Sequence, residues 1–154
     1  MNCISFKKIT NDNLRQIIEL SDTLDEAQRK CVAMNGNSLA QAYVNQEHAW
    51  PRAIYLDDTP IGFIMLDLTP DDIPEGDQPA IYLWRFMIAK DYQNKGYGKK
   101  SLDLLIRKCK DENKKSLYLS CEIENDMPYQ FYIKYGFIDT GIFKDDEQSL
   151  MMKL

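Results

Sequence analysis

The chain has 154 residues, of which 44% are hydrophobic and 28% are charged, a size and balance typical of one compact domain. Nineteen Lys and Arg residues against 24 Asp and Glu residues give a formal net charge of -5. This acidic balance argues against a protein whose main task is to neutralise nucleic-acid phosphates, and it favours cationic partners weakly. We therefore expect residues 1–154 to form a single domain with no nucleic-acid partner.

Neither a membrane span nor a metal site is indicated. No apolar run approaches the roughly 18 residues needed to cross a bilayer, and residues 1–10 hold no apolar signal-peptide core. The four cysteines form no CxxC pair, and His48 has no ligand-like neighbour. These observations predict a cytoplasmic protein with reduced thiols, no membrane partner and no metal.

Apolar spacing and turn-forming residues predict the elements of the first half of the chain. Thr10 is a candidate N-cap for a first helix and Ser38 for a second, so both helices are expected to precede the sheet. The polar stretch 21–37 is ambiguous. The predicted elements are helices over 11–20 and 39–45, strands over 53–56 and 61–66 around a polar turn, and a loop over 69–79.

The second half of the chain begins with the strand 81–88, which is almost continuously apolar with Arg85 as its exception. Such a run is typical of a central strand covered on both faces. The order of elements predicts an α/β fold with one mixed sheet flanked by helices. The other predicted elements are helices over 99–113 and 127–135 and strands over 116–121, 137–143 and 149–153.

A glycine turn joins the central strand to the helix that follows it. Gly96 and Gly98 allow the backbone to turn tightly and present N–H groups, and the helix adds its positive N-terminal end. Lys95, Lys99 and Lys100 supply positive charge that suits a pyrophosphate. The turn lacks the GxxxxGK[ST] and GxGxxG patterns, which disfavours an NTPase or a dinucleotide-binding dehydrogenase. An ordinary strand-to-helix turn is the alternative.

A second group of residues lies at the end of the strand 116–121 and along the next helix. Asn125 can cap this helix, and Gly136 is a suitable stop before the following strand. Tyr132 follows Asn125 by seven positions, or two helical turns, so both side chains can face the same side. The aromatic residues of this helix can equally be core residues.

Together these two segments resemble the GNAT superfamily of acetyl-CoA-dependent N-acetyltransferases. Residues 93–98 (QNKGYG) match the family's pyrophosphate loop, Gln/Arg-x-x-Gly-x-Gly/Ala. Asn125 and residues 131–137 (FYIKYGF) match a second family segment. In that segment an Asn is followed, further along the chain, by a hydrophobic residue and then by Tyr-x-Lys-x-Gly-Phe. Residues 85–88, 92–93 and 119–122 are similar to small bacterial enzymes of the spermine/spermidine acetyltransferase branch. The resemblance covers nearly the whole chain and implies a mostly antiparallel sheet of the acyl-CoA N-acyltransferase type.

The resemblance implies a site for acetyl-CoA between two diverging strands. The backbone of residues 86–88 would pair with the pantetheine arm, and an N–H of Met87 or Ile88 would stabilise the oxyanion. Asn125 would line the cofactor tunnel or orient a water. The residues expected to bind the cofactor are Phe86, Met87, Ile88, Gln93, Asn94, Lys95, Gly96, Tyr97, Gly98, Lys99, Lys100, Asn125 and Tyr132.

The resemblance also implies catalytic roles. Tyr132 corresponds to the tyrosine that protonates the departing thiolate. The amine must lose a proton before it attacks, and polyamine-acetylating relatives often have a carboxylate where this chain has Trp84. We expect Glu122 to serve as the base instead, with a water relay or a solvated strand-end charge as alternatives. Pro128, where the family usually has Ala, is tolerated in a first helical turn.

The acceptor is expected to be a small primary amine, with spermidine or spermine as the candidate polyamines. Trp84, Glu122 and Asp67 are the candidate substrate-binding residues, and the acidic loop 71–77 could also attract a polycation or simply be solvated. Three other interpretations remain open: another acceptor such as an antibiotic, an amino acid or a protein N-terminus; a non-catalytic CoA-binding regulatory module; and a nucleotide-phosphate binder. The resemblance also leaves a homodimer open.

Overall fold

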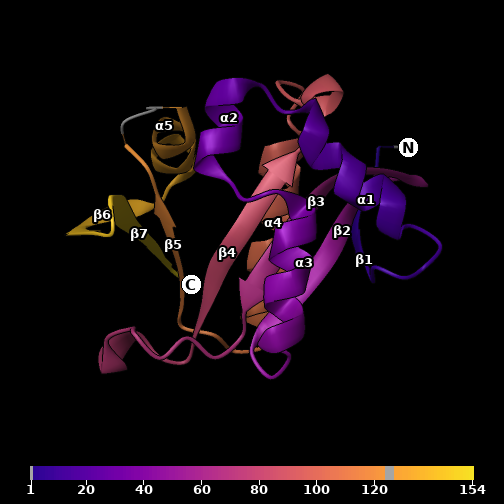
Figure 1. Cartoon of the computed structure of the whole chain (residues 1–154). Helices are drawn as coiled ribbons and strands as arrows, with labels where there is room; N and C mark the ends of the chain where they lie inside the picture. The colour runs from indigo at the N-terminus through magenta and orange to yellow at the C-terminus, as the bar shows by residue number, and fades with distance from the viewer. Residues whose placement is uncertain (1, 124–126) are drawn as a thin grey trace.

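A seven-stranded sheet organises the residues that the computed structural model describes, which are 2–123 and 127–154 (Figure 1). Its strand order is β1-β2-β3-β4-β5-β7-β6, and every neighbouring pair is antiparallel except β4 and β5, which run parallel. The predicted mixed, mostly antiparallel sheet is confirmed. The strands are β1 (Ile4–Lys7), β2 (Ala49–Leu56), β3 (Thr59–Asp67), β4 (Ala80–Ile88), β5 (Ser116–Cys121), β6 (Ile138–Lys144) and β7 (Glu147–Lys153).

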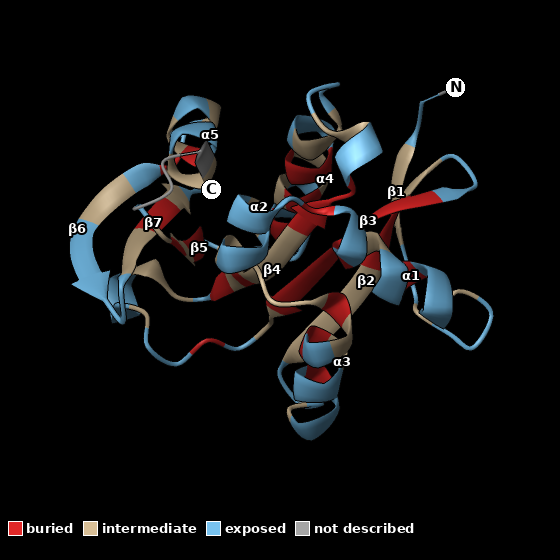
Figure 2. Ribbon diagram, turned by 45° about the horizontal axis from the view of Figure 1, so that its top comes forward, coloured by how far each residue is buried: buried red, intermediate tan, exposed pale blue. Residues whose placement is uncertain are grey.

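Helices cover both faces of this sheet. One face carries α4 and α5, whose Leu102, Leu105 and Tyr132 join the larger apolar cluster. The other face carries α1 and α3, whose Ile17 and Ala42 pack in a second cluster (Figure 2). The central strand β4 contributes to both clusters, as its continuous apolar run predicted. The helices are α1 (Leu14–Leu20), α2 (Glu26–Cys31), α3 (Asn35–Val44), α4 (Tyr97–Asp111) and α5 (Met127–Tyr135).

The expectation that helices precede the sheet is wrong, because β1 comes first and pairs with β2 at one edge. Its four residues are too few to show a clear alternation of apolar and polar positions. The strand is held by a partner some fifty residues away, and the side chain of Asp57 accepts a hydrogen bond of 2.9 Å from the N–H of Cys3. Such pairing carries no local sequence signal.

The second predicted helix also begins earlier than expected. Ser38 does not cap it: α3 starts at Asn35, and Ser38 lies buried inside the helix. The reason is tertiary, because the N–H of Asn35 donates to Oγ of Ser21 (3.0 Å) and its Nδ2 donates to the carbonyl of Ile17 (2.8 Å). The ambiguous stretch 21–37 contains the short 3-10 helix Ser21–Thr23 and α2.

Gly62 lies where the backbones of β3 and β4 leave no room for a side chain. A Cβ at this position would overlap the carbonyl oxygen of Met87 on the neighbouring strand β4 and would contact Ile88 and Ile54. We therefore predict that Gly62→Ala lowers the free energy of unfolding by about 1–3 kcal/mol, the usual cost of overpacking. Urea denaturation would measure this change. Gly76→Ala is the control, since a Cβ there meets nothing within 4 Å; equal stability of both variants would contradict the prediction.

Candidate active site

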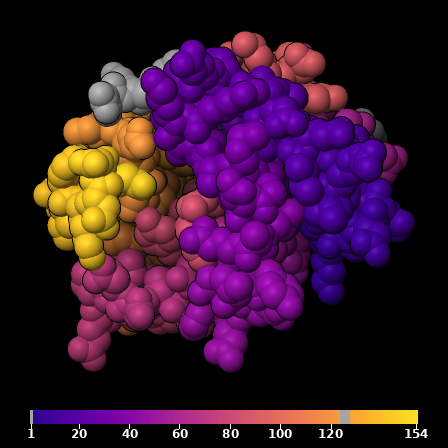
Figure 3. Space-filling model, viewed as in Figure 1, coloured from indigo at the N-terminus to yellow at the C-terminus, as the bar shows by residue number. Residues whose placement is uncertain are grey.

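A cleft of about 690 Å³ opens where β4 and β5 separate. The parallel pairing between these strands runs from Ala80 and Ser116 to Leu83 and Leu119, and it ends there. Beyond Leu83, β4 continues alone on that side, while β5 stays paired with β7 as far as Cys121. The surface of β4 is visible between α2 and the C-terminal strands (Figure 3). Five segments line the rest of the cleft: α2, the turn after β4, α5, the end of β5 and the first residue of β7.

An irregularity in β4 coincides with the point where the strands part. Arg85 is paired with Met65 of β3 and Leu83 with Leu66, so Trp84 is an extra residue without a partner on β3. Such a β-bulge bends a strand and increases its twist. The side chain of Arg85 donates a hydrogen bond of 3.0 Å to the carbonyl of Trp84. The bulge thus marks where β4 turns away from β5.

The turn after β4 presents a row of unused backbone N–H groups. Asn94 and Gly96 have φ angles of 60° and 87°, and α4 begins directly after Gly96. In the described part of the chain, the N–H groups of residues 94–99 have no hydrogen-bond acceptor, and the first intrahelical bond runs from Lys100 to Gly96 (3.1 Å). These donors and the positive end of a fifteen-residue helix form a site suited to an anion.

The side chain of Gln93 ties this turn to two other walls of the cleft. Its Nε2 donates to the carbonyl of Ile88 at the end of β4 (2.8 Å), and its Oε1 accepts from Nε2 of Gln28 on α2 (2.8 Å). Gln28 also forms the capping box of α2 with Asp25, so its position is fixed from both sides. Gln93 therefore holds the turn in place through its side chain.

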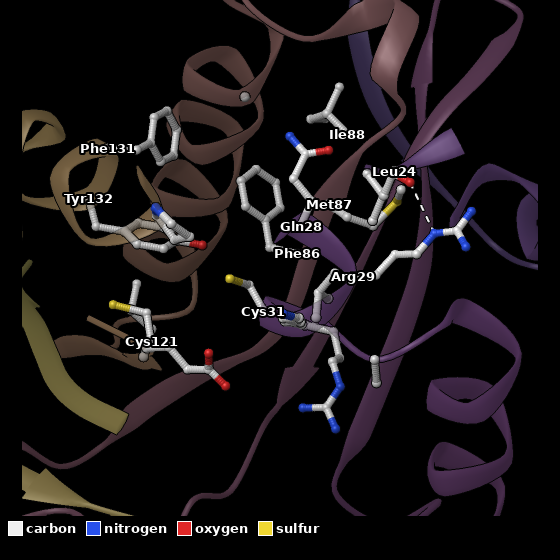
Figure 4. Close-up of a pocket in the computed structure, with 18 of the residues that line it drawn as sticks. Leu24, Gln28, Arg29, Cys31, Phe86, Met87, Ile88, Cys121, Phe131 and Tyr132 are labelled. Atoms are coloured by element: carbon white, nitrogen blue, oxygen red, sulfur yellow. Dashed lines mark hydrogen bonds between the residues drawn. The ribbon is translucent and has the colours of Figure 1, made fainter. Parts of the chain in front are cut away.

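Tyr132 points from α5 into the cleft, towards Phe86 (Figure 4). Its ring packs against Phe131 and Phe137, with ring centroids 5.3 and 5.5 Å away, and only 9% of the residue is exposed. Burial raises the pKa of Tyr132 above its usual value, and the neighbouring Cys121 raises it further. The phenol is therefore neutral at pH 7 and can act as a proton donor in a largely apolar part of the cleft.

The end of the cleft formed by the end of β5 and the start of β7 is polar and carries the carboxylates of Glu122 and Glu147 beside the guanidinium of Arg85. Burial raises the pKa of Glu147, Glu122 raises it further, and the nearby Arg85 opposes this shift. Burial in turn lowers the pKa of Arg85. This end of the cleft suits a cation, whereas the turn after β4 suits an anion.

Most of the site residues predicted from the sequence line this cleft. Gly98 lies so close to α5 that a Cβ there would be 3.4 Å from the ring of Phe131. The lysines of the turn are exposed at the surface beside it, where Lys99 forms an ion pair of 3.5 Å with Asp103. The nominated residues that line the cleft are Trp84, Phe86, Met87, Ile88, Gln93, Asn94, Gly96, Gly98, Glu122 and Tyr132.

Other nominated residues lie elsewhere. Lys95, Tyr97, Lys99 and Lys100 belong to the turn and the start of α4 but are not among the described residues that line the cleft. Asp67 pairs with Tyr82 at the opposite end of the β3–β4 ladder, and its carboxylate accepts the N–H of Thr69 (2.9 Å). The acidic residues of the loop 71–77 are likewise absent from the described lining. Asn125 lies outside the described residues.

Sequence reasoning missed several residues of the cleft. Gln28, Arg29 and Cys31 come from α2, in the stretch that carried no clear signal (Figure 4). Arg85 did carry a signal, because it interrupts an apolar strand. Glu147 had none, since only its place in the sheet brings it to the cleft.

No group of three or more His, Cys, Asp or Glu side chains among the described residues could hold a metal ion. None of the described helices combines the length and apolar character that a membrane span requires.

Known proteins similar to this chain share both its sequence pattern and its fold. A "Probable spermine N(1)-acetyltransferase" of Bacillus subtilis subsp. natto and a "Spermine/spermidine N(1)-acetyltransferase" of Bacillus subtilis strain 168 are each 28% identical to it over 152 residues, or 97% of both chains. The crystal structure of PaiA N-acetyltransferase from Thermoplasma acidophilum in complex with coenzyme A matches with a TM-score of 0.70 at 20% identity, covering 99% of both chains.

A second solved structure, a GNAT family acetyltransferase from Elizabethkingia anophelis with acetyl-CoA bound, matches with a TM-score of 0.68 at 17% identity, over 99% of this chain and 97% of that one. These likenesses at low identity establish the fold. The sequence model of the acetyltransferase (GNAT) family matches residues 13–137, which is most of the chain. The chain therefore belongs to the acetyltransferase (GNAT) family and is an acetyl-CoA-dependent N-acetyltransferase.

Proposed function

We propose that residues 1–154 act as a single domain that transfers an acetyl group from acetyl-CoA to a primary amine of a small molecule, with a polyamine such as spermidine or spermine as acceptor. The observation that carries this proposal is the polarity of the cleft. The backbone N–H groups of the turn after β4, an unpaired length of β4, the buried Tyr132 and the carboxylates of Glu122 and Glu147 all border this one cleft.

Acetyl-CoA fits the first two parts of this cleft. The free N–H groups of residues 94–99 would hold its pyrophosphate, and Lys95, Lys99 and Lys100 would add positive charge at the surface. Phe86, Met87 and Ile88 lie beyond the last pair of the β4–β5 ladder, so the backbone groups of this stretch that are not bonded to β3 or to Gln93 would be open to the pantetheine arm. The co-substrate supplies an activated acyl group. The proposed role of Asn125 in the tunnel stays a prediction.

Tyr132 would supply the proton that the thiolate needs on leaving. A phenol with a usual pKa of about 10 and a thiol with one of about 8.5 are close enough for transfer within a hydrogen bond. An N–H of Met87 or Ile88 would stabilise negative charge on the carbonyl oxygen. We propose direct attack by the amine while both substrates are bound, since the two ends of one cleft hold both.

The polyamine acceptor is supported by the charge of the cleft and by the names of relatives. Glu122 would hold an ammonium group of the acceptor and is the base that the sequence nominates, while Trp84 would line its path. The two Bacillus proteins described above are named for spermine or spermidine acetylation. Asp67 lies at the other end of β4, so a contact with it would need an acceptor long enough to reach there.

An amine panel tests the acceptor directly. We expect acetyl-CoA with spermidine or spermine to release free thiol faster than with aminoglycosides, amino acids or N-terminal peptides. Calorimetric titration should show that acetyl-CoA binds in preference to ATP, because only the former has an arm for the open strand. Binding of acetyl-CoA without thiol release for any amine would contradict the proposal and indicate a regulatory module.

Replacing Tyr132 tests the proton donor. We predict that Tyr132→Phe lowers kcat by about 100-fold or more while the Kd for acetyl-CoA stays within about twofold, because the hydroxyl acts on the leaving group. Steady-state kinetics and calorimetry measure these quantities. The matched control is Tyr135→Phe on the same helix, since Tyr135 donates to Asp103 (2.6 Å) and is not among the described residues of the cleft. Equal kcat in the wild type and Tyr132→Phe would refute the assignment.

Thiol alkylation tests where acetyl-CoA binds. Burial, followed by the nearby Glu147, raises the pKa of Cys121 to about 11, so its thiol is protonated at pH 7.5 and should react with iodoacetamide more slowly than the exposed Cys3. We predict that acetyl-CoA at ten times its Kd slows the alkylation of Cys121 about tenfold relative to the protein without acetyl-CoA. Mass spectrometry of the labelled peptides measures both effects.

Cys109 is the internal control for this experiment. Burial raises its pKa to about 11 as well, but it lies on the buried face of α4 and is not among the described residues that line the cleft. Acetyl-CoA should therefore leave its alkylation rate unchanged, and ATP should protect neither thiol. Protection of Cys109 and Cys121 to the same extent would indicate general stabilisation of the fold instead of occupation of the cleft.

A further inference from the structure

Glu147 faces the cleft because of its register in the sheet. It is the first residue of β7, and β7 pairs with β5 so that Ser149 lies opposite Ser120. Opposite residues in a ladder share a face of the sheet, and residues two apart on one strand do as well. Glu147 therefore lies on the same face as Ser120, and it lines the cleft together with Ser120 and Glu122.

Polar groups of β4 lie on this face too. The hydroxyl of Tyr82 donates a hydrogen bond of 2.7 Å to Oγ of Ser120. Arg85 interacts electrostatically with both Tyr82 and Glu147. A polar row thus crosses from β4 over β5 to β7 at the opening between the strands, and Glu147 forms its end.

The carboxylate of Glu147 has no close ion-pair partner among the described residues. No salt bridge within 4.0 Å joins it to Arg85, whose Nη1 donates to the carbonyl of Trp84 and whose Nη2 donates to Oε1 of Gln41 (3.1 Å). Glu122 and Asp145 add negative charge around it, and Cys121 borders it at the end of β5. Arg29 and Lys30 of α2 line the same cleft. Among the described residues, no direct ion pair therefore occupies the carboxylate of Glu147, and it can accept a proton.

Glu147 is also close to the reacting part of the cleft. Cys121 interacts electrostatically with Glu147 and, independently, with Tyr132. Glu147 precedes Gln148, which pairs with Cys121, and the three residues Glu147, Cys121 and Tyr132 line the same cleft. Glu122, by contrast, follows β5 in a segment without a strand partner, whereas the β5–β7 ladder holds Glu147 in position.

We propose that Glu147 is the general base that takes a proton from the acceptor's ammonium group, while Glu122 binds the acceptor. This assignment rests on the proposed function. The ammonium group loses one proton to Glu147, its nitrogen forms a bond to the acetyl carbon, and the carbon–sulfur bond breaks. Tyr132 gives its proton to the sulfur and regains one from the new amide nitrogen. Glu147 then releases its proton to solvent, so one proton leaves for each amide formed.

A raised pKa suits a carboxylate for this step. Catalytic bases work best when their pKa lies near the working pH, and an ordinary Glu, at about 4.3, is a weak base towards an ammonium of about 10.4. Half-burial and the negative charge of Glu122 both strengthen Glu147 as a base. Below its pKa, Glu147 is protonated and cannot accept, so kcat/KM should rise with pH as it ionises.

The test is the pH dependence of kcat/KM for spermidine in the wild type, Glu147→Gln and Glu122→Gln. We expect Glu147→Gln to lose about 100-fold or more at pH 7. This loss should shrink steadily towards pH 10, where the ammonium group loses its proton to solvent without a base. Glu122→Gln should raise KM and shift the acidic limb to lower pH. A loss of kcat/KM in Glu147→Gln that is the same at every pH overturns the proposal, because it reflects only a structural effect. A loss of kcat/KM below threefold at pH 7 overturns it as well.

Asp146→Asn is the matched control. Asp146 precedes Glu147 in the turn, is exposed, and has a φ of 63°, a conformation that Asn tolerates well. This variant should keep the wild-type pH profile. A profile that changes as much as that of Glu147→Gln would show that the turn, and not the carboxylate of Glu147, is responsible.

A second readout separates this proposal from the proposed function. If no amine is acetylated, the proposed function fails. Titration of the Glu147 carboxyl group by 13C NMR still tests whether Glu147 has the properties of a general base. We expect its pKa to lie above about 4.3 and to fall in Glu122→Gln. A Glu147 that titrates at the ordinary value, or that does not respond to Glu122→Gln, overturns the assignment whatever the acceptor is.

Discussion

The polar backbone of a central strand needs partners along its whole length, and within the described residues β4 has no strand partner on the side of β5 after Leu83. An unpaired stretch of strand beside a cleft can be satisfied by an extended ligand that adds to the sheet edge. The bulge at Trp84, the helix α2 and the start of α5 surround this stretch and keep it open. The site therefore depends on the point at which one parallel ladder stops.

The cleft is bordered by groups of opposite electrostatic character. Free N–H groups and the positive end of α4 lie after β4, while Glu122 and Glu147 lie where β5 ends and β7 begins. A chain with a net charge of -5 thus presents its donors to an anion and its carboxylates to a cation in one cleft. The buried Tyr132 lies between them, in the part where the group transfer would occur.

The sequence predicted well those features that arise from nearby residues. The apolar run of β4, the stripe of α4 and the turn between them are local patterns, and the structure shows all three. It predicted poorly what depends on distant partners. β1 is held by β2, and α3 begins early because Asn35 bonds to Ser21 and Ile17, none of which leaves a mark in the local sequence.

The candidate site divides in the same way. By itself, the sequence determined the tight turn before α4, because two residues with positive φ and a helix start lie within six positions, and a motif on one helix singled out Tyr132 as a candidate. Only the tertiary structure decided that Gln28 of α2 fixes Gln93 and that Glu147 faces the cleft. The physical reason is that register and packing join residues 27 to 65 positions apart, whereas turn and helix geometry act over a few residues.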